Sequence, residues 1–399
     1  MAEGLQKASP RSPRFDNLGY LVGPSGGALI GREELKAALP SEQAQIFVAS
    51  WNVAGKRPSP ENLVSWLRPK GWENEADMYV IGIQEGPSLD GDFWEEWEQQ
   101  LAQCLGFRYM RYFSHRLGVL ALVIFVRRSL IWFLTGSGSV MINPANPLKY
   151  VSKTKGAAAV AFNLFRTSFL FINSHLSYGP KTQLRLENYR KILSGLRFHR
   201  YPPADIPGAQ AEDSFLLLNN FDYIFWFGDL NFGTEGKRRG VEKLVTDCIQ
   251  KRDFNPLMQK DLLGKEMRAG RIFGKFYEAK IVFPPTYKYD VGSSAFDSSG
   301  KQRVPAYTDR ILYRHRGPVD PLVYQCTRDV CLSDHKPIWG LYRIPIKAGG
   351  AIRSRASIVE LERTGTGLGK LAGSPQPASQ TGVDGVPVPP RKSRICALS

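Results

Sequence analysis

Short apolar runs recur along the middle of the chain, and several of them stop abruptly at a polar side chain. Tyr223 to Phe227 forms such a run, and Asp229 and Asn231 follow it. An apolar, aromatic-rich run of this length predicts a buried strand. Because residues two apart on a strand point to the same face, we expect Asp229 and Asn231 to face one cleft.

The other apolar runs predict further strands, at residues 46–52, 77–85, 107–113, 119–126, 131–140, 157–165, 169–174 and 338–344. Helical periodicity predicts helices at residues 33–39, 93–105, 182–196, 239–250 and 259–267. Several strands are joined by tight connections, which favours largely antiparallel sheets. The pattern therefore predicts a mixed α/β fold whose strand ends carry polar groups.

Composition divides the chain into three parts. Residues 1–42 are rich in Gly, Pro, Ser and Ala and offer little to bury, so we expect a flexible lead-in. Residues 347–399 shift to Gly, Ser, Pro, Arg and Lys, and we expect a disordered basic tail. The whole chain is 43% hydrophobic, and residues 43–346 are expected to form one folded domain.

The net charge and the cysteines limit the binding partners and the cellular compartment that we expect for the protein. A formal net charge of +16 predicts attraction to nucleic acid, an anionic membrane or a phosphorylated small molecule, and does not choose among them. The five cysteines are scattered without metal-type pairs, which favours a reduced, cytoplasmic protein. The longest wholly apolar run, Val119 to Val126, is far too short to span a bilayer, and no signal peptide is predicted.

Oxygen ligands and two imidazoles gather at the predicted strand ends. They are Asn52, Glu85, His175, Asp229, Asn231, Asp309, Asp334 and His335. Any one of them alone would more often be an ordinary turn residue. Together they suit Mg²⁺, which prefers oxygen ligands, whereas zinc would call for paired Cys or more His. Such a set is what metal-assisted attack of water on a phosphoester requires.

A series of motifs in consistent order resembles the inositol polyphosphate 5-phosphatases of the endonuclease/exonuclease/phosphatase superfamily. The motifs are Trp51-Asn-Val53, Gln84-Glu85, Asn173-Ser-His-Leu176, Trp226-Phe-Gly-Asp-Leu-Asn-Phe232, Pro305-Ala-Tyr-Thr-Asp-Arg-Ile-Leu312 and Ser333-Asp-His-Lys-Pro337. The resemblance runs from about Ile46 to Ile344. It implies a deoxyribonuclease-I-like α/β (α+β) fold, a four-layered sandwich of two mostly antiparallel β-sheets flanked by helices.

The resemblance also implies catalytic roles on the metal and water side of the site. Glu85, with Asn52 nearby, matches the Mg²⁺ site of the family. Asp229 matches the group that orients and deprotonates the attacking water. The implied reaction is Mg²⁺-dependent removal of the 5-phosphate from phosphatidylinositol 3,4,5-trisphosphate and 4,5-bisphosphate.

On the phosphate side, the resemblance places Asn231 and His335 on the oxygens of the scissile phosphate, where negative charge grows. His175 is implied to meet the phosphate as well, with Asp309 holding its ring orientation. Asp334 is implied to complete the acidic floor by orienting His335 or the water shell of the metal.

Substrate choice is expected from basic groups outside that floor. In the family, the segment that matches Tyr287 and Lys288, together with Lys301 and Arg303, grips the 4-phosphate. Arg offers phosphate a bidentate fork and Lys a mobile point charge. A solvated basic face is the alternative for these residues. Lys155 is expected to add a contact near the inositol ring.

Two positions depart from the family pattern. Gly233 stands where most members have Arg, and Thr154 stands where Asn is widespread. The first raises the question of a lost contact near Asp229 and a lower activity. The second is shared with the farnesylated type IV members, which the segment from Lys153 to Ala157 resembles most.

The chain ends in Cys396-Ala-Leu-Ser399, which matches a CaaX box for farnesylation. One lipid chain anchors only marginally, and the basic residues Arg391, Lys392 and Arg394 would each add about 1 kcal/mol on an anionic leaflet. We therefore expect a monomeric peripheral membrane protein that binds phosphoinositide lipids. The family resemblance adds Golgi or ciliary membranes and a prenyl-binding chaperone as expected partners.

Two other functions remain open from the sequence. A nuclease of the same superfamily would share the fold and the metal, and the positive charge would suit it, although the basic recognition motif and the lipidation signal give no reason to expect nucleic acid. A membrane-tethered pseudophosphatase that only binds phosphoinositides would require that Gly233 has disabled the site.

Overall fold

The computed structural model describes residues 31–70, 76–87, 92–143, 155–198 and 217–348. It also describes two short paired strands, Arg14–Phe15 (β1) and Leu21–Val22 (β2). The rest of the predicted lead-in, Thr154 and the predicted tail from residue 349 onward, with Cys396, lie outside the described residues. No helix in the described part is both long and apolar enough to cross a membrane.

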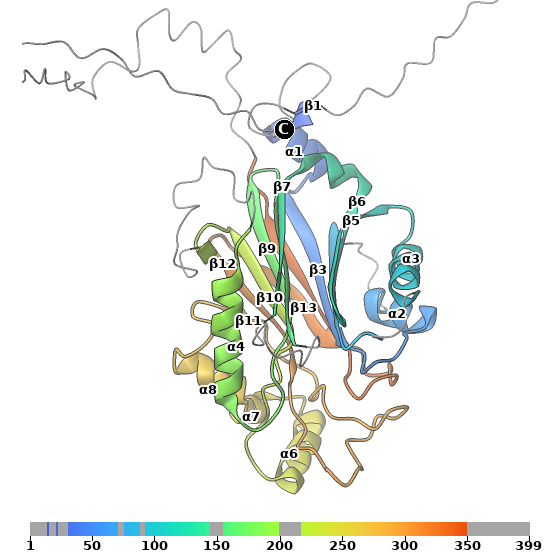
Figure 1. Cartoon of the computed structure of the whole chain (residues 1–399), viewed down its shortest axis with the longest axis vertical. Coiled ribbons are helices and arrows are strands. Elements are labelled where there is room, and N and C mark those ends of the chain that lie inside the picture. Colours follow the sequence, from blue (N-terminus) through green and yellow to red (C-terminus); the bar gives the residue numbers. More distant parts are fainter. Residues whose placement is uncertain are drawn as a thin grey trace, which may run out of the picture. The chain divides into compact units, whose positions relative to one another are not determined.

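Two six-stranded sheets form the centre of the fold (Figure 1). In the first sheet the strand order is Tyr277–Glu278 (β11), Asp309–His315 (β12), Tyr223–Asp229 (β10), Thr167–His175 (β9), Gly156–Leu164 (β8) and Leu134–Ile142 (β7). In the second sheet it is Asp320–Cys326 (β13), Ile338–Pro345 (β14), Gln43–Asn52 (β3), Met78–Gln84 (β4), Leu120–Arg127 (β6) and Tyr109–Leu117 (β5). Each sheet contains one parallel pair, and its other pairs are antiparallel, as predicted.

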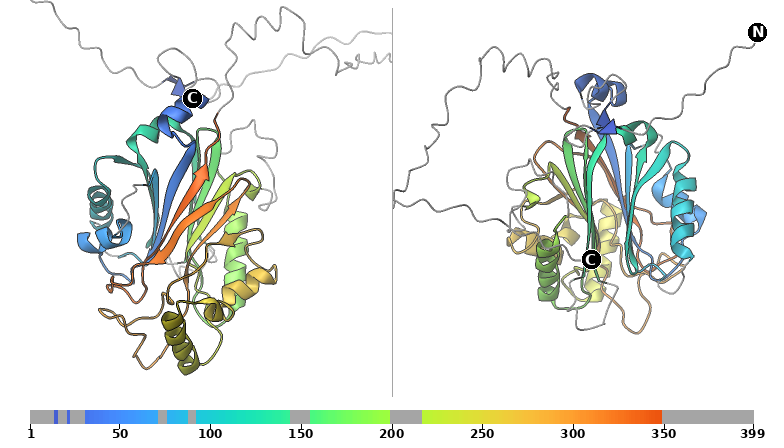
Figure 2. Two further views of the ribbon diagram at one scale, coloured as in Figure 1. Left: turned by 180° about the vertical axis from the view of Figure 1, so that it is seen from behind. Right: turned by 45° about the horizontal axis from the view of Figure 1, so that its top comes forward.

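Helices cover the outer faces of both sheets (Figures 1 and 2). The described α-helices are Arg32–Ala38 (α1), Pro60–Leu67 (α2), Phe93–Leu105 (α3), Thr182–Gly195 (α4), Arg238–Lys251 (α6), Asn255–Met258 (α7) and Leu262–Arg268 (α8). Trp66 of α2 and Trp97 of α3 pack on the second sheet, and Tyr189 of α4 packs on the first. The core between the sheets is apolar and includes Val80 and Phe225. The predicted four-layered sandwich is therefore confirmed.

Several elements differ from the sequence prediction, which did not include strands β11 and β12 or helix α7. Helix α2 was not predicted, although Ser59 and Asn62 form a capping box in which each side chain accepts from the other's backbone N–H. The strand predicted from residue 131 starts later, because Arg128–Phe133 forms a 3₁₀-helix (η1) before β7. Strand β13 was missed because it lies at a sheet edge and alternates weakly.

The packed part of the fold reaches back beyond the domain boundary predicted at residue 43. Leu35 on α1 and Leu39 just after it are buried in the core between the sheets. The predicted helix at residues 33–39 corresponds to α1. This helix packs because its apolar residues recur four apart and so share one face.

The parallel pairs bring chemically important strand ends together. In the first sheet His175, at the end of β9, is the register partner of Asp229, at the end of β10. Asp229 is also the register partner of Asp309, at the start of β12. Gly228 makes this approach possible, since it has φ 129° and an added Cβ would lie 2.0 Å from the carbonyl oxygen of Ser174.

A buried ion-pair network joins β12 to the start of α8 and to the edge strand β11. Arg310, 1% exposed, donates from Nη1 to both carboxylate oxygens of Asp261 at 3.0 Å, and from Nε to Oε1 of Glu278 at 2.8 Å. Asp261 is itself fully buried. Burial disfavours the charged guanidinium, but these two carboxylates outweigh that effect and raise the pKa of Arg310 well above its usual value.

We expect Arg310→Met to lower the free energy of unfolding by about 3 to 5 kcal/mol, because it leaves two carboxylates without their buried partner. Arg343→Met is the matched control, since Arg343 pairs at 3.3 Å with Asp320 on the exposed surface. The control should lose about 1 kcal/mol or less. Urea unfolding followed by circular dichroism measures both, and equal losses in the two variants would contradict a structural role for the network.

Candidate active site

The strand ends of both sheets open into one cavity of about 260 Å³. It is lined by Asn52, Ala54, Glu85, Lys155, His175, Tyr178, Asp229, Asn231, Tyr287, Lys288, Lys301, Arg303, Asp334 and His335. These include every predicted site residue except Asp309, which lies beneath His335, and Cys396, which lies outside the described residues. Tyr178 and Ala54 were not predicted, because neither belongs to a polar strand end.

Asp229 is the buried centre of the cavity, and groups from both sheets hold its carboxylate. Oδ2 accepts from Asn52 Nδ2 at 3.0 Å and lies 3.1 Å from His175 Nε2. Oδ1 accepts from the backbone N–H of Asn231 at 3.1 Å. Burial works against the charge, but His175, His335 and Lys155 outweigh it and hold the pKa of Asp229 well below its usual range. The carboxylate is therefore ionised and fixed in orientation.

Asn231 reaches the cavity through a turn rather than through strand alternation. Strand β10 ends at Asp229, and Asn231 follows with φ 55°, a left-handed conformation that Asn tolerates better than most residues. Its side-chain amide donates to the carbonyl oxygen of Leu176 at 3.0 Å. The two residues line one cavity, as the sequence predicted, but the geometry that joins them is this turn.

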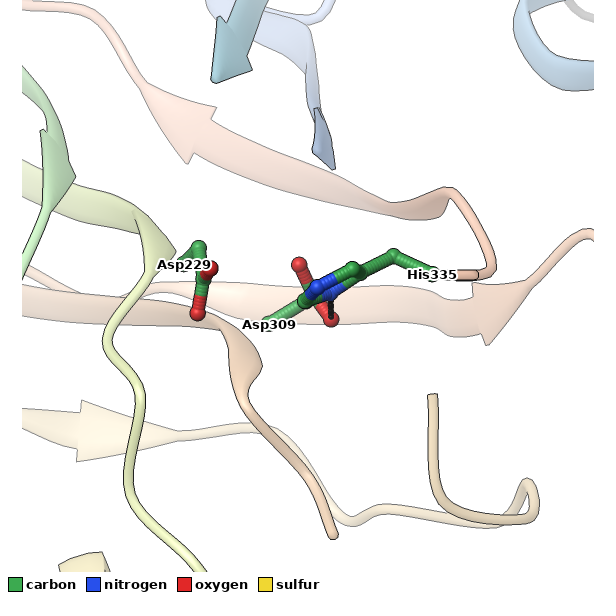
Figure 3. A group of neighbouring side chains, drawn as sticks. All are labelled: Asp229, Asp309 and His335. Carbon is green, nitrogen blue, oxygen red and sulfur yellow. Dashed lines mark hydrogen bonds and ion pairs between the residues drawn. The ribbon is translucent and has the colours of Figure 1, made fainter. Parts of the chain in front are cut away.

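His335 is the second buried ionisable group. Its Nδ1 lies 2.9 Å from Oδ2 of Asp309 (Figure 3). The same carboxylate oxygen accepts from the hydroxyls of Thr286 at 2.7 Å and Thr308 at 3.0 Å. Burial lowers the pKa of the imidazole, but Asp309, with smaller effects from the other carboxylates of the site, raises it to about 9. His335 is therefore protonated at neutral pH.

The partner predicted for Asp309 was wrong. Asp309 was expected to orient His175, whereas it bonds His335, and the ring of His175 lies against Asp229. The strand register explains the exchange, because it sets His175 directly beside Asp229. His335 arrives from the other sheet on the loop before β14, where its backbone N–H donates to Ser333 Oγ and its carbonyl accepts from Trp51.

Asp334 was expected to orient either His335 or the water shell of a metal, and the first of these alternatives is wrong, because the ring of His335 bonds Asp309 instead. The carboxylate of Asp334 faces the basic side of the cavity, with Oδ2 3.9 Å from Lys288 Nζ. Lys288 lies equally far, 3.9 Å, from Asp297 Oδ1. Asp334 acts on His335 only through its charge, which favours the protonated ring. Adjacent residues on this loop point to different walls of the cavity, which the sequence could not distinguish.

Glu85 and Asn52 could hold a cation. Oε1 of Glu85 lies 3.8 Å from Lys155 Nζ and 3.7 Å from His175 Nε2, both beyond hydrogen-bond length. Oδ1 of Asn52 accepts one hydrogen bond, from Ala54 N–H at 3.0 Å, and keeps a second lone pair. Oxygen atoms of this kind fit a hard divalent cation.

A second set of possible ligands consists of Asp229, Asp309 and His335, whose ligand atoms lie within 4.8 Å of one another (Figure 3). It fits a metal less well, because Asp309 and His335 already bond each other and the ring is protonated. A protonated imidazole has no lone pair to offer. The geometry therefore favours the side of Glu85 and Asn52 for a cation.

Lys155 lies on the metal side of the cavity. Its ammonium contacts the ring of His175 at Nε2. Burial lowers the pKa of Lys155, and Asp229 and Glu85 act in the opposite direction. The contact near the inositol ring predicted for it stays a prediction.

The opposite wall is basic and aromatic. Lys288, Lys301 and Arg303 line it, and the guanidinium of Arg303 stacks 5.0 Å from the ring centroid of Tyr178. The ring of Tyr287 lies 4.4 Å from the ring of His335. The cavity thus joins an anionic, oxygen-rich side to a cationic side, an arrangement that can hold a polyphosphate over an activated water.

Gly233 does not line this cavity. A Cβ at Gly233 would meet only Leu262 Cδ1, at 3.8 Å, so a side chain would be accommodated there. The departure from the family pattern leaves the contacts of Asp229 in place.

Comparison with known proteins identifies relatives across most of the chain. A family model described as endonuclease/exonuclease/phosphatase family 2 matches residues 49–341. The type IV phosphatidylinositol polyphosphate 5-phosphatase of Homo sapiens is 39% identical over 347 residues, 85% of this chain and 52% of that protein. The Mus musculus protein of the same name is 40% identical over 83% of this chain and 50% of its own length. The chain thus spans about half the length of these curated relatives.

Two solved structures are similar to this chain. The inositol polyphosphate 5-phosphatase domain of SPsynaptojanin, in complex with inositol (1,4)-bisphosphate and a calcium ion, is 33% identical with a TM-score of 0.65, over 80% of this chain and 89% of that domain. Cimex nitrophorin, 20% identical with a TM-score of 0.56 over 76% of this chain and 99% of its own, shares the fold alone. Both confirm the predicted sandwich, and the first confirms the resemblance seen in the motifs.

We expect Asp309→Asn to move the pKa of His335 from about 9 toward 6.5, its usual value, because the variant removes the carboxylate beside the ring. In the parent, the raised pKa means that this pair stabilises the fold fully below pH 6.5 and that the stability is lost as pH rises through about 9. The variant should show a flatter pH dependence of unfolding across that window. NMR titration of the imidazole resonances measures the pKa, with Asp320→Asn as control, and an unchanged pKa in Asp309→Asn would refute the pairing.

Proposed function

The chain belongs to the endonuclease/exonuclease/phosphatase family 2, and on this premise we propose that it is a phosphoinositide 5-phosphatase. Its proposed substrates are phosphatidylinositol 3,4,5-trisphosphate and phosphatidylinositol 4,5-bisphosphate. The observation that carries the proposal is the single cavity in which the ionised Asp229 and the protonated His335 face a wall of three cations. The names of the relatives support the same class of substrate.

In the proposed reaction a water attacks the phosphorus, the bond from phosphorus to the 5-oxygen of inositol breaks, and this oxygen leaves as a hydroxyl group by taking up a proton from solvent. Asp229 orients this water and accepts a hydrogen bond from it, with His175 and Asn52 fixing the carboxylate. Because the pKa of Asp229 is low, the proton that leaves the water passes on toward solvent rather than resting on the carboxylate. Orientation is therefore the main contribution of Asp229.

The phosphoryl oxygens gain charge as the water adds. The protonated ring of His335 and the side-chain amide of Asn231, which both line the cavity, would donate to those oxygens. Asp309 keeps the imidazole charged and fixes its orientation through Nδ1, which leaves Nε2 for the phosphate. The arrangement is built before substrate arrives, so little reorganisation is needed in the transition state.

Mg²⁺ is the proposed cofactor, with Glu85 and Asn52 as its protein ligands. An ion held there would neutralise phosphate charge and polarise a phosphoryl oxygen. Lys155, beside Glu85 and His175, adds positive charge on the same side.

Recognition of the 4-phosphate is proposed for the cationic wall. Lys288 and Arg303, with Lys301, would bind it by charge-assisted hydrogen bonds, and Tyr287 would pack along the inositol. Nuclease activity is less well supported, because the relatives compared above are named as inositol polyphosphate and phosphoinositide 5-phosphatases. A pseudophosphatase is less well supported because the contacts around Asp229 are intact.

Membrane attachment is proposed for the tail. Cys396 would carry a farnesyl group, and the upstream basic residues would bind an anionic leaflet. The lipid would place the enzyme on the surface that holds its substrates, and a prenyl-binding chaperone would carry it between membranes.

We expect Asp229→Asn and His335→Asn each to lower kcat on phosphatidylinositol 4,5-bisphosphate by on the order of a hundredfold or more, with the fold retained. Asp320→Asn, an exposed change on the second sheet, is the control and should behave as the parent. Phosphate release is measured with and without Mg²⁺ and in excess chelator. Full activity in chelator, or near-normal turnover in either site variant, would remove the corresponding part of the proposal.

We expect Cys396→Ser to leave hydrolysis of a soluble short-chain substrate unchanged, because the substitution lies far along the chain from the site residues. The same variant should leave the membrane fraction of cells, since the basic residues alone bind weakly. Fractionation and imaging measure the change. If the variant stays with membranes as the parent does, the lipid anchor is refuted.

A further inference from the structure

A second cavity, of about 420 Å³, lies at the other end of β12 from the active site. Its polar lining comes from Asn219, Lys275, Tyr277, Arg314, His315 and Arg316. Strand β12 begins with Asp309 beneath His335 and ends at His315. A strand of this length spans about 20 Å, so the cavity is separate from the active site.

The lining carries basic groups and no carboxylate. Among the described residues, no carboxylate forms an ion pair with Lys275, Arg314 or Arg316. Asp222 is near, since its carbonyl oxygen accepts from Arg316 N–H at 2.9 Å, but its carboxylate is bonded to Ser168 and Lys347. The cavity therefore holds a positive charge that the described residues do not neutralise.

Arg314 shows most clearly that the positive charge of this cavity is not neutralised by the described residues. It is half-buried, and its guanidinium donates to the neutral side-chain oxygen of Asn219. Burial lowers the pKa of Arg314, Tyr189 acts against this, and the like charge of Arg316 lowers it further. Arg310, on the same face of the same strand, is instead neutralised by two carboxylates. A guanidinium held in this way is stabilised when an anion occupies the space beside it.

We propose that this cavity is a second, non-catalytic site that binds a phosphoryl group. Arg314 and Arg316 would supply planar donors that match phosphate oxygens, and Lys275 a point charge at the rim. Tyr277, 53% exposed, has its ring 5.1 Å from that of His315 and offers an apolar surface to a ring that carries the phosphate. Free phosphate, a soluble phosphorylated ligand and a lipid head group share this chemistry.

The site does not depend on the proposed function, because none of its residues lines the active-site cavity. A full-length protein that lacks phosphatase activity could still bind phosphate here. The test therefore measures binding rather than turnover.

Isothermal titration calorimetry of the full chain with inositol 1,4-bisphosphate should give two equivalents, one for each cavity. Arg314→Gln should weaken one of them by about tenfold to a hundredfold, as expected for loss of a charge-assisted hydrogen bond. Arg343→Gln, an exposed arginine on the second sheet, is the matched control and should retain both. Phosphate release by Arg314→Gln should equal that of the parent.

A second variant guards against misfolding. Lys275 is exposed, so Lys275→Gln changes the charge of the cavity without altering the core, and it should weaken the same equivalent. A single equivalent in the parent that both variants leave unchanged, or two equivalents that both variants leave unchanged, would overturn the proposal. A single equivalent that both variants weaken would support this site and count against the proposed active site instead.

Two further measurements identify the source of the phosphoryl group. One is a parallel titration with inorganic phosphate, and the other is sedimentation with vesicles that contain phosphatidylinositol 4-phosphate. Weaker binding of the soluble probes alone supports a soluble ligand for this site. Weaker sedimentation of Arg314→Gln as well supports a lipid head group. If Arg314→Gln binds the soluble probes and the vesicles as the parent does, the cavity is not a phosphoryl site.

Discussion

The buried carboxylate of Asp229 is the constraint on which the site depends. An ionised group removed from water is stable only when donors and positive charge surround it. Here they come from separate parts of the fold: Asn52 from the second sheet, His175 from the neighbouring strand and the backbone of Asn231 from the turn that follows. The two sheets must therefore meet in one arrangement for this charge to be tolerated, which couples the packing of the core to the chemistry at its edge.

Two adjacent residues at the start of β12, Asp309 and Arg310, have different roles. Asp309 points between the sheets, where it keeps His335 protonated. Arg310, the next residue, points to the other face and pairs with Asp261 at the start of α8 and with Glu278 on β11. The two side chains point to opposite faces of the sheet because successive residues of a strand alternate between its faces. The ion pairs of Arg310 hold in place the strand that carries Asp309. The stability of the fold and the orientation of His335 therefore depend on two adjacent residues.

Much of the architecture follows from the sequence, because apolar runs with polar ends have few ways to fold. Asp229, His175 and Asn52 were expected at one cleft on that ground, and the structure brings them together. The pairing of Asp309 with His335 could not be predicted, since it depends on strand register and on a loop from the other sheet. Tyr178 was missed because its place in the wall depends on stacking with Arg303, a contact between distant parts of the chain. Helix α2 was missed although Ser59 and Pro60 signalled its start.

Gly228 allows Asp229 and His175 to lie close together because it has no Cβ. With the carbonyl of Ser174 only 2.0 Å from where its Cβ would be, any larger residue would push β10 away from β9 and carry Asp229 away from His175. The two side chains could both be conserved and yet fail to act together. Sequence variation at this backbone position would thus behave as an active-site change while touching no reactive atom, and a search for inactive relatives of this chain should read the glycine alongside the acids and histidines.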